Sequence, residues 1–408
     1  MKRFLLIWLM MSMAVAAIGV EEGVPTFHNN NQRTGRTEVN GPRNPQLLWT
    51  FSTQASVTAS PVIGTDGTVY LASTDGNLYA IDQAGREKWV FTAEESIFGT
   101  PAIAPDGSIL FGDLEGKYYA VNPDGTRKWL YRFRSGLEKR ILASPVVNED
   151  GQSFICGWNK EVHAVDADGL VVWKKSLSGL LTSSPVMDAE NHVYFGEKDG
   201  NQLAIHQFSP SSSYPKWTYK DKIFAGGERL IGTPAIDTAR DHLVIGVCTN
   251  QGGRVNCIRL SNHMTRWRTD LPKGIFSSPA LGKDGTVYIG CLGGAHVEGD
   301  EALQKREFGM LYALNPDSGE VAWTFQTEGY YIFGSPTVDG EGVIYIGDSD
   351  GIVYAVSPEG KELWRFPTQG TIASAPVLDA SGKLYVTSYD SHLYAISNPT
   401  AVYDWRTF

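Results

Sequence analysis

The sequence predicts an all-β protein, an eight-bladed β-propeller of four-stranded antiparallel blades that is closed by the N-terminal strand. Three observations predict this fold class. A pattern of about forty residues recurs along the chain, it occurs eight times, and a lone outer strand precedes the first copy. Repetition of small sheets around an axis is typical of propellers, because each sheet can bury its two apolar faces only against neighbours of its own kind.

The most regular copy of the pattern lies in residues 335–366. Its expected strands are Ser335–Val338, Val343–Gly347, Ile352–Val356 and Glu362–Phe366. Turns rich in aspartate and glycine separate them, and glycine supplies the positive φ that tight hairpin turns need. Four such strands form one small antiparallel sheet.

Four landmarks mark each copy: a proline, then a small residue, then an alanine and finally a tryptophan on the outermost strand. The prolines are Pro61, Pro101, Pro145, Pro185, Pro234, Pro279, Pro336 and Pro376. The tryptophans are Trp49, Trp89, Trp129, Trp173, Trp217, Trp267, Trp323 and Trp364. A residue that occurs once per blade at the rim cannot converge on one ligand, so these indoles are expected to pack blade against blade.

The two ends of the chain complete the ring. Trp49 precedes Pro61 at the regular spacing, but its own first three strands are missing, whereas the last copy lacks a fourth strand. The strand Gln46–Phe51 is therefore expected to complete the eighth sheet. The alternative is the C-terminal segment Tyr403–Phe408, which carries Trp405.

The first residues are predicted to be a signal peptide, residues 1–19. Lys2 and Arg3 precede an apolar run, Phe4–Ala17, and small residues follow it. The run is too short to span a bilayer, and no cysteine follows it for lipid attachment. We therefore expect a periplasmic or secreted protein with no transmembrane segment after cleavage.

The remaining organisation follows from these boundaries. Residues 20–45 are expected to be an extended lead-in wrapped on the ring, residues 46–399 the propeller and residues 400–408 a C-terminal tail. The formal net charge is −10, and no basic patch is concentrated enough to indicate nucleic-acid binding. We expect a monomer.

Four cysteines are present. Cys156 and Cys257 occupy positions that hold glycine or alanine in sister copies, so they are expected to be small buried side chains. Cys248 and Cys257 lie on one expected hairpin, and an oxidising compartment would permit a disulfide between them. The expected register sets them about two residues apart, which leaves this bridge open.

The long connections indicate a candidate binding surface. In a propeller, the connections between blades and those between second and third strands share one face. Three of the four longest, Arg132–Ile141, Lys220–Ile231 and Cys291–Gly309, fall there, and Ser209–Pro215 falls on the opposite face. The candidate binding residues are Arg132, Arg134, Arg140, Arg229, Glu301 and Arg306. Loops on a rigid scaffold often carry function, although surface insertions are also tolerated without one.

The ends of several copies resemble a known repeat. Ala80–Trp89, Ala313–Trp323 and Ala355–Trp364 are similar to the pyrroloquinoline-quinone (PQQ) repeat, and the resemblance covers about residues 45–400. It implies a quinoprotein-like or BamB-like β-propeller. Members include PQQ-dependent dehydrogenases and a non-catalytic assembly scaffold of the bacterial envelope.

The resemblance implies different sites for these two activities. The dehydrogenases place an adjacent cysteine pair against the quinone and hold calcium in the funnel, but no two cysteines are adjacent here. The eight histidines are scattered singly, and no nucleophile motif is present. We therefore predict a non-enzymatic scaffold, without cofactor or metal, that binds a protein or peptide in the cell envelope. The alternatives are a PQQ-dependent dehydrogenase-like protein and a propeller that binds a small ligand in its funnel.

Overall fold

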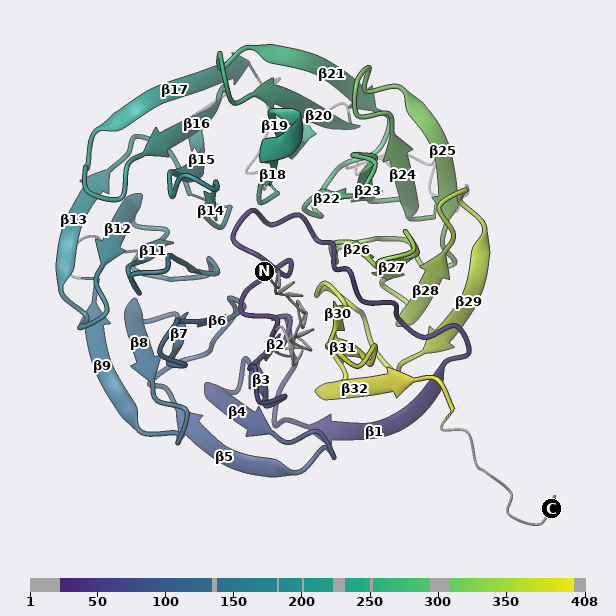
Figure 1. The fold of residues 1–408 in the computed structure, drawn as a ribbon, viewed down its shortest axis with the longest axis horizontal. Coiled ribbons are helices and arrows are strands. Elements are labelled where there is room, and N and C mark those ends of the chain that lie inside the picture. Colours follow the sequence, from purple (N-terminus) through teal and green to yellow (C-terminus); the bar gives the residue numbers. More distant parts are fainter. Residues whose placement is uncertain are drawn as a thin grey trace, which may run out of the picture.

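The computed structural model describes most of the chain, namely residues 23–133, 138–181, 183–199, 202–222, 232–249, 252–293 and 308–399. The described strands form eight four-stranded antiparallel sheets, which stand as blades around one axis (Figure 1). The predicted eight-bladed propeller is confirmed.

Each blade starts at the axis with a short inner strand and continues outward. The inner strands of blades 1 to 8 are β2 (Val62–Ile63), β6 (Ala102–Ile103), β10 (Val146–Val147), β14 (Val186–Met187), β18 (Ala235–Asp237), β22 (Ala280–Leu281), β26 (Thr337–Val338) and β30 (Val377–Leu378). The second strands are β3 (Val69–Ala72), β7 (Ile109–Gly112), β11 (Ser153–Cys156), β15 (Val193–Asp199), β19 (His242–Thr249), β23 (Val287–Cys291), β27 (Ile344–Gly347) and β31 (Leu384–Ser388).

The outer half of each blade repeats the same order. The third strands are β4 (Asn77–Ile81), β8 (Lys117–Val121), β12 (Glu161–Val165), β16 (Gln202–Phe208), β20 (Gly252–Arg259), β24 (Met310–Leu314), β28 (Ile352–Val356) and β32 (His392–Ser397). The outer strands are β5 (Glu87–Thr92), β9 (Arg127–Arg132), β13 (Val171–Ser176), β17 (Pro215–Lys222), β21 (Thr265–Leu271), β25 (Val321–Gln326), β29 (Glu362–Pro367) and, for blade 8, β1 (Gln46–Ser52). One short 3-10 helix, η1 (Thr238–Arg240), follows β18.

The N-terminal strand closes the ring. β1 pairs antiparallel with β32, and Trp49 lies opposite Ala395. In the regular blades the outer tryptophan likewise lies opposite the repeat alanine of its own blade, as Trp89 does opposite Ala80. Trp49 therefore completes the eighth blade, as predicted. The competing segment around Trp405 lies outside the described residues.

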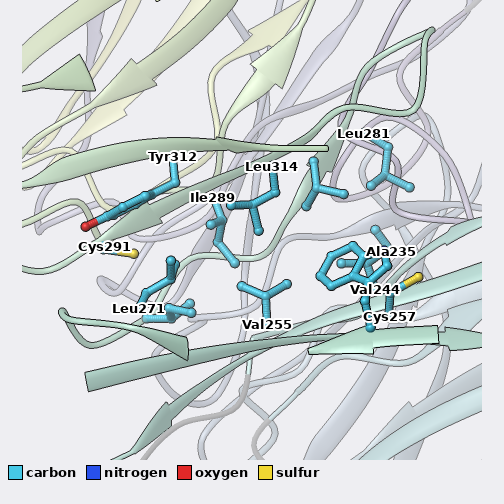
Figure 2. Packing of buried hydrophobic residues seen from close by; sticks show 13 residues of the cluster. Ala235, Val244, Val255, Cys257, Leu271, Leu281, Ile289, Cys291, Tyr312 and Leu314 are labelled. Carbon is cyan, nitrogen blue, oxygen red and sulfur yellow. The ribbon is translucent and has the colours of Figure 1, made fainter. Parts of the chain in front are cut away.

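Alternate residues of the middle strands pack against opposite neighbours. On β27, Ile344 and Ile346 join the core between blades 6 and 7, while Tyr345 joins the core between blades 7 and 8. Figure 2 shows the equivalent core between blades 5 and 6, where Val244 and Ile289 lie among its buried side chains. Because both faces of each blade are buried, these strands are apolar throughout rather than alternating.

The repeat tryptophans bind each blade to the next one. In seven of the eight, the indole Nε1 donates a hydrogen bond of 2.8–3.1 Å to a backbone carbonyl on or beside the neighbouring blade. The donors Trp49, Trp89, Trp129, Trp173, Trp267, Trp323 and Trp364 pair with Gln83, Pro123, Ala167, Pro210, Pro316, Pro358 and Pro42, in that order. Trp217 differs, because its buried Nε1 finds no partner among the described residues.

A turn glycine makes this contact possible. At Gly125 the backbone φ is +88°, and an added Cβ would lie 2.8 Å from the ring of Trp89. A side chain there would meet both strain and a clash, so the glycine and the tryptophan of adjacent copies form one contact.

A second ring of hydrogen bonds surrounds the axis. The residue before the repeat proline is serine or threonine in seven of the eight blades. Its hydroxyl accepts a hydrogen bond of 2.9–3.1 Å from the backbone N–H of the residue at the same position in the preceding blade. The acceptors are Ser60, Thr100, Ser144, Ser184, Thr233, Ser278 and Ser335. Ala375 holds the eighth position, and it has no hydroxyl to accept the N–H of Ser335.

Residues 23–45 run along the inner strands before they reach β1, and Figure 1 shows this purple segment around the centre of the ring. The backbone N–H two residues after a repeat proline donates to this segment in six blades at 2.7–2.9 Å. The pairs are Ile63–Val24, Ile103–Pro25, Met187–Asn31, Ile236–Gln32, Leu281–Thr34 and Val338–Gly35. The segment therefore ties most blades together across one face of the ring.

Arg33 anchors this segment at the axis. It is fully buried, and burial lowers its pKa to about 9. Its guanidinium donates to the carbonyl oxygens of Pro145 (2.8 Å), Ser144 (3.2 Å) and Pro185 (3.3 Å). A buried charge is stable only when its donors are paired, and blades 3 and 4 supply these acceptors.

The four cysteines are buried free thiols in the described structure, so the Cys248–Cys257 bridge that the sequence left open is not formed there. Cys257 lies opposite Val244 on the hairpin, and Cys248 lies opposite Gly253. The two cysteines are therefore four residues out of register, too far along the strands for a disulfide.

Candidate functional site

The propeller has two unlike faces. We call the face with the blade-to-blade connections and the turns between second and third strands the insertion face. The other face carries the remaining turns and the lead-in, and we call it the turn face. Of the predicted binding residues, Arg132 and Arg140 are described, while Arg134, Arg229, Glu301 and Arg306 lie outside the described residues.

Arg132 and Arg140 lie on the insertion face in separate contacts. Arg132 Nη2 is 3.3 Å from Glu94 Oε1, and the same carboxylate is bound by Lys117. These hydrogen bonds and charges, with that from Lys117 the largest, hold the pKa of Glu94 below its usual range. The guanidinium of Arg140 instead lies over the ring of Trp158, 5.8 Å from its centre. Both side chains stay exposed, so they can still meet a partner.

An aromatic ledge lies on the same face across blades 6 and 7. It consists of five rings in sequential contact, Phe308, Tyr330, Tyr331, Phe333 and Phe276, with centres 5.4–6.3 Å apart. Tyr330 is 37% exposed and the others are half-buried. Sequence reasoning missed this ledge, although the run Tyr330–Phe333 directly before Pro336 was the available signal.

Tyrosine–aspartate pairs hold the third strands at the insertion face in four regular blades. The tyrosine hydroxyl donates to the aspartate at 2.7–3.0 Å in Tyr79–Asp75, Tyr119–Asp113, Tyr354–Asp348 and Tyr394–Asp390. Burial and the aspartate raise the pKa of Tyr79 to about 12. These hydroxyls therefore stay protonated and keep donating at any physiological pH.

Histidine replaces the tyrosine in blades 3 and 4. His163 is fully buried, stacks on Phe133 at 3.9 Å and bonds Tyr131 Oη at 3.0 Å. Burial lowers the pKa of His163 to about 4, against the opposing effect of Glu161. In blade 4, His206 lies between Glu197 and Thr218.

The His206 contact shapes the electrostatics of blade 4. Burial alone would raise the pKa of Glu197, but hydrogen bonds from His206 and from the backbone N–H of Gly179 outweigh it and hold that pKa below its usual range. His206 Nδ1 is 2.9 Å from Thr218 Oγ1, which lies on the exposed outer strand. The three groups satisfy one another's hydrogen bonds, so they hold the blade together as the tyrosine–aspartate pairs do elsewhere.

Comparison with known families identifies the chain. The family described as outer membrane protein assembly factor BamB matches residues 39–226, 115–273, 251–359 and 307–408. The chain belongs to this BamB-like family of PQQ repeats. A search of curated protein sequences finds no match.

Solved structures of BamB and of quinoprotein-type dehydrogenases share the fold of this chain. BamB from Moraxella catarrhalis has a TM-score of 0.69 at 19% identity, covering 86% of this chain and 99% of that one. Quinohemoprotein alcohol dehydrogenase from Comamonas testosteroni has a TM-score of 0.78 at 16% identity, covering 92% and 80%. A europium-containing methanol dehydrogenase has a TM-score of 0.72 at 14% identity, covering 92% and 98%. At these identities the likeness shows the fold alone, and it includes both an assembly protein and enzymes.

One ring of positions around the axis lies on the insertion face. On the insertion face, the positions three residues before the repeat prolines follow one another around the axis, since Thr58 donates to the carbonyl of Phe98. The described members are Thr58, Phe98, Leu142, Phe276, Phe333 and Ala373. None of these six described residues carries a charge, and the buried Arg33 binds backbone carbonyls from the turn face.

One cluster in the described residues has metal-ligating groups. Ligand atoms of Asp188, Glu190 and His192, in the first turn of blade 4, lie within 4.8 Å of one another. Sequence reasoning did not single out this trio. Asp188 already accepts from His192 (3.0 Å) and Tyr194 (2.8 Å), and Lys216 Nζ lies 2.6 Å from the other nitrogen of His192. Asp188 and His192 therefore already have hydrogen-bond partners within the protein.

No helix in the described residues is long and apolar enough to span a membrane.

Proposed function

We propose that this BamB-like propeller is a non-catalytic scaffold of the cell envelope that binds a protein partner on its insertion face. The aromatic ledge carries the proposal. Its rings run from the axis toward the long connection of blade 6, and partly exposed aromatic side chains on a rigid support are typical of the centres of protein interfaces. The assembly-factor description of the family supports the same function.

The charged groups of the insertion face support a rim around this ledge. The exposed Arg132 and Glu94 form a cluster with the half-buried Lys117 on blades 1 and 2, and Arg140 lies over Trp158 on blade 3. Exposed charges of this kind contribute more to the rate of association and to the choice of partner than to affinity. The predicted leader, residues 1–19, supports the compartment, although it lies outside the described residues.

Site-specific photo-crosslinking in cells tests the surface. A crosslinking side chain at Tyr330 should capture one defined partner, whereas the same side chain at Met264 should not, because Met264 lies on the turn face although it is more exposed (62%, against 37% for Tyr330). Tyr330→Ser should reduce co-purification of that partner at least about tenfold, and Met264→Ser should leave it unchanged. Equal capture from both positions would contradict the proposed surface.

A cofactor experiment tests the non-catalytic part of the proposal. The purified protein is mixed with PQQ and calcium, and the absorption spectrum and alcohol-dependent dye reduction are recorded. We expect the spectrum of free quinone and no dye reduction. A shifted chromophore that supports turnover would assign the protein to the enzymatic branch instead.

A further inference from the structure

The turn face has a cavity of about 650 Å³ between the lead-in and the first turns of blades 1 to 4. Its volume lies within the range of roughly 300–1,000 Å³ typical of small-molecule sites. The cavity is separate from the aromatic ledge, which lies on the opposite face, so the inference drawn from it is independent of the proposed function.

A compact loop of the lead-in forms one wall of the cavity. Pro25 and Asn31 accept backbone hydrogen bonds from blades 2 and 4, and the residues between them turn back on themselves. The backbone N–H of Asn29 donates to Thr26 O at 3.2 Å, and His28 and Asn29 have φ of +57° and +71°. Non-glycine residues adopt positive φ only where the surroundings hold them there, so the loop is a built feature of the fold.

The charge of the lining excludes anionic ligands. Asp66, Glu149 and Asp188 contribute carboxylates from blades 1, 3 and 4, and the described lining contains no lysine, arginine or histidine. A phosphate or carboxylate ligand would meet like charges without a cation to pair with. The ligand must therefore be neutral or positively charged.

The hydrogen-bonding groups of the lining narrow the chemical class of the ligand further. Asn29 Nδ2 is buried without a partner among the described residues, and it requires an acceptor. The Glu149 carboxylate is exposed and Asn31 is half-buried, and within the described chain neither Glu149 nor Asn31 Oδ1 accepts a hydrogen bond, so both can accept donors from a ligand. An ammonium group supplies donors only. A hydroxyl group supplies both a donor and an acceptor, and a ligand with several hydroxyls satisfies all three groups.

The remaining wall is apolar. Ile103 and Pro105 of blade 2 and Met187 of blade 4 line the cavity between the polar groups. Sugar rings present C–H faces between their hydroxyls, and such faces pack against apolar side chains of this kind. We propose that this cavity binds a short neutral saccharide, with Asn29 donating to a sugar oxygen and Glu149 accepting from a sugar hydroxyl.

Calorimetric titration of the purified protein tests the proposal. The probes are maltotriose and the trisaccharide of N-acetylglucosamine, with spermidine and citrate as cationic and anionic comparisons. We expect at least one trisaccharide to bind with a measurable Kd at millimolar concentration and neither comparison ligand to do so. Binding of spermidine or citrate alone, or of none of the four, would overturn the proposal.

Three variants place the binding in this cavity. Asn29→Asp keeps a residue that tolerates positive φ but replaces the donor by an oxygen, so Kd should rise at least about tenfold. Glu149→Gln, at an exposed position, should raise Kd about threefold or more. Gln54→Ala, exposed on the insertion face, is the control and should leave Kd unchanged. If Asn29→Asp fails to fold, Glu149→Gln becomes the deciding variant. An unchanged Kd in Glu149→Gln would then show that the saccharide does not bind in this cavity.

Discussion

Blades 1, 2, 7 and 8 and blades 3 and 4 fill one position of the repeat with different chemistry. The regular blades place a tyrosine that donates to an aspartate, as in Tyr119–Asp113 at 2.9 Å. Blades 3 and 4 place His163 and His206 there, beside Glu161 and Glu197. The comparison teaches that the fold needs a flat ring with a hydrogen-bonding end at this position.

The same blades differ in how the outer tryptophan is held, and the largest expected effect concerns this difference. In blade 2, Trp129 donates to Ala167 O at 3.0 Å and packs on Gly169, whereas in blade 4 Trp217 Nε1 has no partner in the described structure. Trp129→Ala should lower the free energy of unfolding by about 3–5 kcal/mol. Trp217→Ala should lower the free energy of unfolding by about 1 kcal/mol less than Trp129→Ala does, because Trp217 has no hydrogen bond to lose among the described residues.

Denaturant unfolding of both variants measures this difference. Trp158→Ala, which removes a half-buried tryptophan outside the repeat positions, is the matched control and should cost less than either. Equal losses for Trp129→Ala and Trp217→Ala would show that the hydrogen bond to the next blade contributes nothing.

A substitution that converts blade 3 to the regular chemistry should alter the pH dependence of stability. The pKa of His163 is about 4 in the folded protein and about 6.5 in the unfolded chain. The unfolded chain therefore binds more protons as the pH falls from about 6.5 to 4, and the free energy of unfolding decreases over that range. This loss is up to about 3 kcal/mol for such a group, and His163→Tyr should remove it.

The measurement is the free energy of unfolding at pH 7 and at pH 4 for both proteins. Part of the acid sensitivity should persist in the variant, because burial also lowers the pKa of His28 to about 4. His392→Gln, at a half-exposed histidine of blade 8, is the control and should follow the unaltered protein. An unchanged pH profile in His163→Tyr would show that folding does not lower the pKa of His163.

The smallest expected effect concerns the axis, where blade 8 departs from the other seven. Ala375→Ser would supply the missing hydroxyl and allow the N–H of Ser335 to donate across blades as its counterparts do at 2.9–3.1 Å. We expect the free energy of unfolding to rise by about 0.5–1.5 kcal/mol, the usual net value of one hydrogen bond. Thermal unfolding measures it, and a lower melting temperature would show that the position has no room for the hydroxyl.

Much of the fold could be predicted because its signals are local. In blade 7 the expected and observed third strands coincide at Ile352–Val356, and the outer strand differs only at its last residue. The register of the hairpin that carries Cys248 and Cys257 was harder to predict, because the length of the turn sets it. The sequence indicated an offset of about two residues between the cysteines, whereas the structure has four. The candidate site was hardest, because spacing identified the loops but not the side chains that meet across them.

The sequence by itself determined the number of blades, the strand spans of blade 7 and the closure by Trp49, because these depend on a spacing that every copy repeats. Only the tertiary structure decided which groups gather around the axis and on the two faces. Phe276 meets Phe333, and Asn29 faces the same cavity as Glu149, although each pair is far apart along the chain. The physical reason is that closing the ring sets the distances between blades, and no local pattern of residues encodes those distances.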